Sequence, residues 1–82
     1  MEKNYMYIIH YERCNILSRG EFSMAVYRDK PITTEEDKAD VKRLVRRQHI
    51  FSKCTMLWYA LKKAPDNADA SVHAMVNRRK PF

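Results

Sequence analysis

The chain has 82 residues, of which 45% are hydrophobic and 32% are charged, and its formal net charge at pH 7 is +6. This length leaves room for one small domain, and the composition is that of a folded protein, which argues against global disorder. No apolar run approaches the roughly 20 residues that a membrane-spanning helix needs.

The positive charge is concentrated in the middle of the sequence. Residues 32–64 hold eight of the sixteen basic residues and four of the ten acidic ones. A positively charged surface suits phosphate groups, acidic protein patches or anionic lipid headgroups, although it can also serve solubility alone. We therefore expect a macromolecular partner and no small-molecule substrate.

Two stretches near the N-terminus have the pattern of strands. Aromatic and β-branched side chains alternate in residues 5–13, and apolar side chains alternate with others in residues 21–28. Gly20 is the only glycine, and we expect it at a positive φ where the chain turns back. The pattern predicts a β-hairpin over residues 5–28, with a helix over residues 5–18 as the alternative. Four tyrosines are expected to be half-buried packing residues rather than a platform for stacking bases: Tyr5, Tyr7, Tyr11 and Tyr27.

Residues 33–63 are expected to form a long central helix. A capping box begins it, in which Thr33 accepts a hydrogen bond from the amide of Glu36, and acidic residues crowd its first turns. Apolar residues then recur at spacings of three and four as far as Leu61, which predicts one buried face. A single helix of this length is unusual in so small a protein, so a break near residues 48–52 is the alternative.

The predicted fold class is α+β. After Pro65 we expect a short helix over residues 66–77 and a basic tail over residues 78–82. The N-terminal hairpin would pack on the long central helix, which gives the order ββαα. An all-α arrangement of helical hairpins is the alternative.

No constellation of catalytic or metal-binding residues is recognisable. His10, His49 and His73 fall on three different predicted elements, and a single glycine excludes a glycine-rich phosphate loop. Cys14 and Cys54 fit no zinc spacing, and without a signal peptide both are expected to be reduced. We therefore expect a cytoplasmic protein that is not an enzyme, with no catalytic residue, metal site or cofactor.

Basic residues follow the side of the predicted helix that lies opposite its apolar face. Together with the tail they make up the predicted nucleic-acid-binding surface: Lys42, Arg43, Arg46, Arg47, Lys53, Arg78 and Arg79. Long basic side chains can contact successive phosphates or the edges of bases. Nucleic-acid binding is therefore the first functional hypothesis.

The second hypothesis is a protein-binding adaptor or inhibitor that grips an acidic partner, such as a host regulator. It rests on a surplus of large apolar side chains that a core of this size does not easily hide, namely Met56, Leu57, Trp58 and Tyr59. It predicts a homodimer or a captured partner protein. Membrane-surface association through the basic helix is a third option, but the acidic first turns of that helix disfavour it, so no membrane partner is expected.

Residues 51–82 resemble the small ANR (AraC negative regulator) and PerC-type regulators of enteric plasmids and prophages. The resemblance lies in the aromatic Phe51 that precedes the pair Leu57-Trp58, and in the closing Asn77-Arg78 and Phe82. In those families the aromatic and the Leu-Trp pair lie on the second helix of a helical hairpin. They also place a glycine before the aromatic, where this chain has His49-Ile50, and they lack its tyrosine-rich first third. The resemblance implies a small bacterial or phage modulator of transcription that acts through a protein partner.

Overall fold

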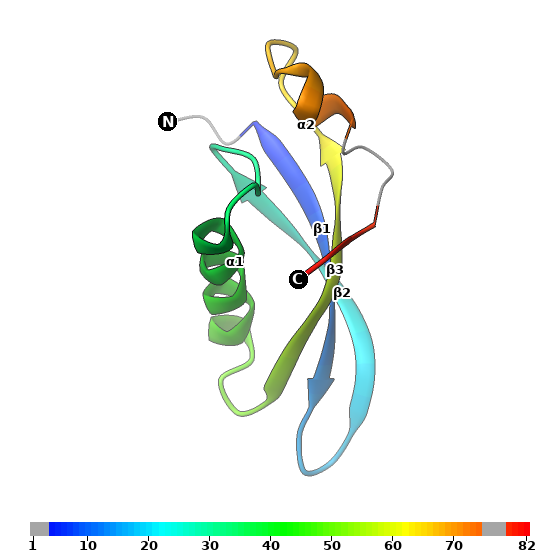
Figure 1. Ribbon diagram of the computed structural model, residues 1–82. Helices are drawn as coiled ribbons and strands as arrows, with labels where there is room; N and C mark the ends of the chain where they lie inside the picture. Colours follow the sequence, from blue (N-terminus) through cyan, green and yellow to red (C-terminus); the bar gives the residue numbers. More distant parts are fainter. Residues whose placement is uncertain (1–3, 75–78) are drawn as a thin grey trace.

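The computed structural model describes residues 4–74 and 79–82 of the chain, which form a β-sheet with one helix packed across it (Figure 1). The elements are β1 (Tyr5–Cys14), β2 (Arg19–Arg28), α1 (Glu35–Gln48), β3 (Lys53–Lys63), α2 (Ala70–Ala74) and β4 (Lys80–Pro81). The strand order is β2-β1-β3-β4, and each neighbouring pair is antiparallel. β2 and β3 therefore run parallel on either side of β1, and α1 connects them across one face of the sheet.

The β-hairpin predicted over residues 5–28 is present, and the alternative helix over residues 5–18 is not. The pairing of β1 with β2 runs from Tyr5 opposite Arg28 to Cys14 opposite Arg19. Their turn is closed by Asn15, whose side-chain oxygen accepts hydrogen bonds of 2.8 Å from the amides of Leu17 and Ser18.

The expectation of a positive φ at Gly20 is wrong, because this residue lies within β2, opposite Arg13 on β1. A Cβ atom at Gly20 would lie 3.3 Å from the ring of Phe22, which is tighter than ordinary van der Waals contact. Arg13 instead places its guanidinium carbon over that ring, 4.7 Å from the centroid. The glycine therefore leaves room for this contact rather than making the turn.

The predicted helix over residues 33–63 is wrong beyond Gln48, where α1 ends. After the turn at residues 49–52 the chain continues as β3, so the fold class of a hairpin on one long helix is wrong, and the all-α alternative is wrong too. The molecule is a mainly β sheet with two short helices. A break near residues 48–52 does occur, but a strand follows it.

The side-chain pattern of β3 explains this difference. Its first half alternates between buried Cys54 and Met56 and their exposed neighbours, which is the two-residue period of a strand. In the pairing with β1, Leu57 and Lys62 are extra residues at two shifts of register. Such β-bulges interrupt the alternation, so residues 56–61 carry apolar side chains on both faces and imitate an all-round apolar helix.

The C-terminal elements also differ from the prediction. The helix expected over residues 66–77 is limited to Ala70–Ala74 in the described residues, and residues 75–77 lie outside them. The expected basic tail over residues 78–82 includes β4, which pairs with Trp58 and Tyr59 of β3. Phe82 follows it and packs edge-to-face on Tyr59, with 5.2 Å between the ring centroids.

The hydrophobic core lies between α1 and the face of the sheet that α1 covers. The helix contributes Val41 and Val45, one turn apart and fully buried. The other buried members are Tyr7, Ile9, Tyr11, Val26, Ile32, Cys54, Met56, Tyr59, Leu61 and Val72. Tyr7 and Tyr11 are thus packing residues, as expected, but they are fully rather than half buried, and Tyr27 is exposed. Both cysteines are free thiols, and burial raises the pKa of Cys54.

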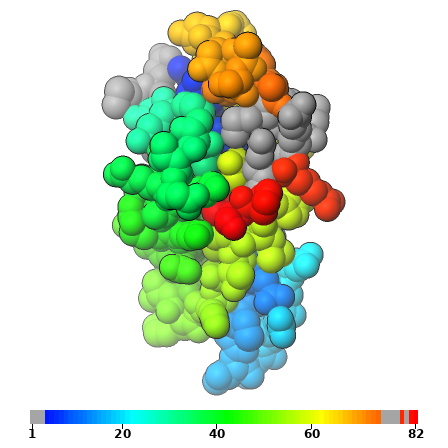
Figure 2. Space-filling view, viewed as in Figure 1, coloured from blue at the N-terminus to red at the C-terminus, as the bar shows by residue number. Residues whose placement is uncertain are grey.

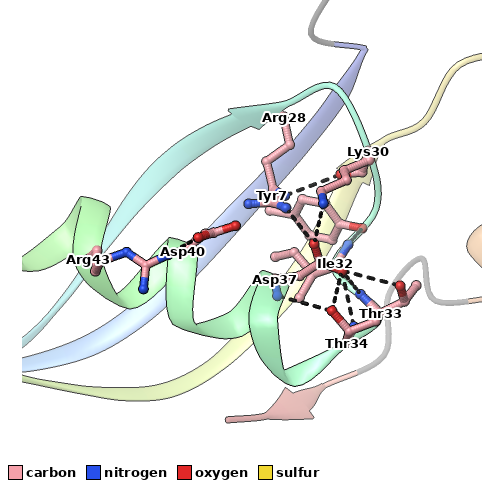
Figure 3. A network of polar contacts seen from close by, with 9 residues as sticks. All are labelled: Tyr7, Arg28, Lys30, Ile32, Thr33, Thr34, Asp37, Asp40 and Arg43. Carbon is pink, nitrogen blue, oxygen red and sulfur yellow. Dashed lines mark hydrogen bonds and ion pairs between the residues drawn. The ribbon is translucent and has the colours of Figure 1, made fainter.

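A buried polar network ties the start of α1 to the hairpin (Figure 3). Asp37 pairs with Arg28 at 3.0 Å and with Lys30 at 3.2 Å, and accepts hydrogen bonds from the amides of Thr33 and Thr34. The capping box is therefore Thr34 with Asp37, one residue later than predicted. Burial by itself would raise the pKa of Asp37, but these hydrogen bonds and the Lys30 ammonium hold it well below its usual range.

Candidate nucleic-acid interface

A groove of about 590 Å³ lies between the C-terminal half of α1 and the N-terminal half of β3. Its lysine, arginine and histidine lining residues are Lys42, Arg46, His49 and Lys53, and the rest of its described lining is Ile50, Ser52, Cys54, Thr55, Met56 and Phe82. None of these described lining residues is acidic. We refer to this feature as the cationic groove.

Two consecutive elements, joined by the turn at residues 49–52, supply the charges. Lys42 and Arg46 are four residues apart on α1 and so share one side of the helix. Lys53 begins β3 and is exposed at the far wall. The fold therefore gathers three of the predicted basic residues, although Lys53 lies on a strand and not on the predicted helix.

The C-terminal residues close one end of the groove. Figure 2 shows them in red, seated between α1 in green and β3 in yellow-green. The ammonium group of Lys42 lies 5.9 Å from the centre of the Phe82 ring, within the range of a cation–π contact. An aromatic ring and a fixed positive charge thus meet at this end.

The edge of β3 that borders the groove is open. β4 pairs only with Trp58 and Tyr59, so no described strand pairs with residues 53–57 on the side away from β1. Unpaired N–H and C=O groups along a sheet edge can bind an anion or an added strand. The groove therefore offers backbone groups as well as positive side chains.

Among the described residues, Arg43, Arg47 and Arg79 lie outside the lining. Arg43 is exposed and forms an ion pair with Asp40, and Arg47 is exposed in the last turn of α1. Arg79 lies over the ring of Trp58, 4.7 Å from its centroid. Arg78 is outside the described residues. The structure thus brings together Lys42, Arg46 and Lys53, with Arg47 close by in the sequence of α1.

The four residues predicted to bind a partner protein do not form one exposed surface. Met56 and Tyr59 are buried under α1, and Leu57 is the extra residue of a bulge. Trp58 is half-buried on the opposite, outer face, where it stacks on His10 with 3.6 Å between ring centroids and 14° between planes. Burial lowers the pKa of His10, and the charges of Arg79 and Lys62 lower it further.

An exposed apolar surface lies elsewhere, at the end of the sheet that carries the two loops 15–18 and 49–52. Its large side chains are Ile16, Leu17, Ile50 and Phe51. Sequence reasoning missed it, because residues 49–52 were assigned to the helix region and residues 14–20 were considered only as a turn. The sequence feature that could have indicated this surface is a pair of consecutive large apolar residues in each turn segment, Ile16-Leu17 and Ile50-Phe51.

Comparison of the chain with known protein families, with curated proteins and with solved structures finds no match in any of the three. The resemblance to the ANR and PerC-type regulators therefore stays a prediction, and the helix that it implies around Trp58 is a strand here. Among the described residues, no helix is both long and apolar enough to cross a bilayer.

Proposed function

We propose that this chain is a small cytoplasmic regulatory protein, not an enzyme, that binds nucleic acid through the cationic groove. The observation that best supports the proposal is the convergence of Lys42, Arg46 and Lys53 on one groove whose described lining has no acidic side chain. Positively charged grooves follow the phosphate backbone and supply most of the affinity of non-specific binding.

The remaining lining groups suit the same ligand. Hydroxyl groups such as those of Ser52 and Thr55 commonly donate hydrogen bonds to phosphate oxygens. The rings of His49 and Phe82 offer surfaces on which a sugar or a base can pack. Charge, hydroxyl donors and aromatic surface therefore occur together along one path.

The proposal is tested by fluorescence anisotropy with labelled duplex and single-stranded oligonucleotides over a range of salt concentrations. Arg46→Ala combined with Lys53→Ala should lower the affinity at low salt by about tenfold or more. It should also reduce the slope of log affinity against log salt by roughly two, because each phosphate contact contributes about one to that slope. Both side chains are exposed, so the fold should be retained.

Arg43→Ala is the matched control, because Arg43 is an exposed arginine of the same helix that is paired with Asp40 and does not line the groove. Its affinity should stay within about twofold of the wild type. The proposal fails if the wild type shows no salt-dependent binding to either oligonucleotide. An equal loss in the control and in the double variant would also exclude the groove as the binding site.

A second candidate function is an adaptor that binds an extended acidic peptide. The open edge of β3 over residues 53–57 favours it, because a peptide can add as a strand there. Its carboxylates would meet Lys42 and Arg46, and its apolar side chains would meet Ile50 and Met56. Tighter binding of a polyglutamate peptide than of an oligonucleotide with the same number of charges would favour this function over the first.

A further inference from the structure

One end of the molecule exposes four large apolar side chains, which we call the apolar cap. Ile16 and Leu17 are 100% and 89% exposed at the tip of the hairpin, and Ile50 and Phe51 are 72% and 91% exposed in the next loop. Figure 1 shows both loops at the lower end of the molecule. A cluster of apolar side chains with this exposure is unusual on a soluble surface and marks a site of interaction.

The two loops are held together by their own contacts. The hydroxyl of Tyr11 lies 2.8 Å from Nε2 of His49, the residue at the C-terminal cap of α1. At the hairpin turn, the side-chain amide of Asn15 donates to the hydroxyl of Ser52 at 3.5 Å. The apolar cap is therefore made of two loops that are joined by a hydrogen bond rather than of two independent segments.

Basic residues flank each apolar pair. Arg19 follows Leu17 by two residues, Lys53 follows Phe51 by two, and Arg46 and Arg47 lie in the last turn of the helix that leads into the second loop. The described carboxylates on this part of the hairpin are Glu12, which pairs with Arg19 at 3.1 Å, and Glu21. We call the four basic residues Arg19, Arg46, Arg47 and Lys53 the rim of the cap.

The other described carboxylates lie away from the cap. They are in the connection from β2, in the first half of α1 and near α2: Asp29, Glu35, Glu36, Asp37, Asp40, Asp66 and Asp69. The register of the sheet places the ends of β2 and β3 together with the start of β1, opposite the two loops. This distribution of charge would turn the apolar cap toward a negatively charged surface.

We propose that the apolar cap inserts into the surface of an anionic lipid bilayer, with the basic rim on the lipid headgroups. Acyl chains accept exposed apolar side chains without a matching cavity, and basic residues beside them add electrostatic attraction. A second copy of the chain is a poor occupant, because two positive rims would be brought together. The inference does not depend on nucleic-acid binding, although Arg46 and Lys53 would serve both ligands and so make them compete.

The test is co-sedimentation of the full chain with phosphatidylcholine vesicles and with vesicles that also contain phosphatidylglycerol. The wild type should partition onto the anionic vesicles and much less onto the neutral ones. Ile16→Ser with Leu17→Ser, and separately Ile50→Ser with Phe51→Ser, should each lower partitioning by about tenfold or more. Tyr27→Ser removes an exposed aromatic from the far end of β2 and should leave partitioning unchanged.

Each other outcome contradicts the proposal. Equal sedimentation with both kinds of vesicle, or none, would exclude an anionic bilayer. Unchanged partitioning of both serine variants would mean that electrostatic attraction alone holds the chain on anionic vesicles and that the apolar cap does not insert. A wild-type dimer that the serine variants convert to monomer in analytical ultracentrifugation would assign the cap to a protein interface. The Ile16→Ser with Leu17→Ser variant changes no residue of the groove lining and should keep its oligonucleotide affinity, so failure here is distinct from failure of the groove.

Discussion

The carboxylate of Asp37 lies 3.0 Å from the guanidinium of Arg28, and both side chains are almost completely buried. Arg28 ends β2, and Asp37 is in the first turn of α1, so this pair fixes the angle at which the helix leaves the hairpin. That angle determines where Lys42 and Arg46, five and nine residues further along the helix, face β3. The cationic groove therefore depends on an ion pair that is far from its lining.

Asp37→Asn should lower the free energy of unfolding by about 3 kcal/mol, because it leaves the guanidinium of Arg28 buried without its counter-charge. Asp40→Asn is the control. Asp40 is on the same helix but is more exposed and pairs only with Arg43 among the described residues, so its loss should cost less than about 1 kcal/mol. Urea denaturation followed by circular dichroism measures both, and equal values would contradict the structural role of Asp37.

The same network predicts an acid limit of stability. Burial would raise the pKa of Asp37, but the amides of Thr33 and Thr34 and the ammonium of Lys30 lower it below the ordinary value of 3.8. Its contribution to stability is therefore complete above about pH 4 and is lost as the pH falls through the folded-state pKa. The melting temperature of the wild type should fall in acid by more than that of Asp37→Asn, and parallel curves would contradict this assignment.

Tyr7→Phe should lower the free energy of unfolding by about 1 to 3 kcal/mol. The buried hydroxyl of Tyr7 accepts a hydrogen bond of 3.0 Å from the amide of Ile32, and without it that amide is buried with no partner. Tyr27→Phe makes the same chemical change at an exposed position and should have little effect. A loss of similar size in both variants would mean that the Tyr7 hydroxyl has no special role.

His10 should titrate below its ordinary range, because burial, then Arg79 and then Lys62 lower its pKa. The folded state favours neutral His10. The contribution of this preference to the free energy of unfolding is therefore complete above about pH 6.5 and is lost as the pH falls through the folded-state pKa of His10. Arg79→Gln should raise the pKa of His10, as followed by NMR or by the fluorescence of its stacked neighbour Trp58. Lys42→Gln, which removes a charge on the helix side, should leave it unchanged.

Local patterns predicted the hairpin and the position of the helix start to within one residue. The two-residue period of β1 is visible in the sequence, because every second side chain from Tyr7 to Tyr11 is buried. The capping box is formed by Thr34 and Asp37 instead of Thr33 and Glu36, because Asp37, and not Glu36, reaches the buried Arg28. That choice depends on a contact between two elements, which a local pattern does not contain.

The strand β3 was missed because two bulges conceal its period. Leu57 and Lys62 add residues that oppose nothing on β1, so the sequence around them loses its alternation. Residues such as Leu, Met, Ala and Lys also favour helices by themselves, and pairing with β1 overrides that preference. The groove is predicted in part, since Lys42, Arg46 and Lys53 are expected on one surface, but Phe82 joins them only through the tertiary fold.

The most direct test of the cationic groove is a titration of the ¹⁵N-labelled chain with a short oligonucleotide, followed by backbone amide NMR. The account predicts that the largest shifts occur at Arg46, Lys53 and Thr55, with little change at His10 or Ser23 on the outer face of the sheet. The largest shifts at His10, Ser23 and Trp58, or no shifts at any residue, would contradict the groove as the site of nucleic-acid binding.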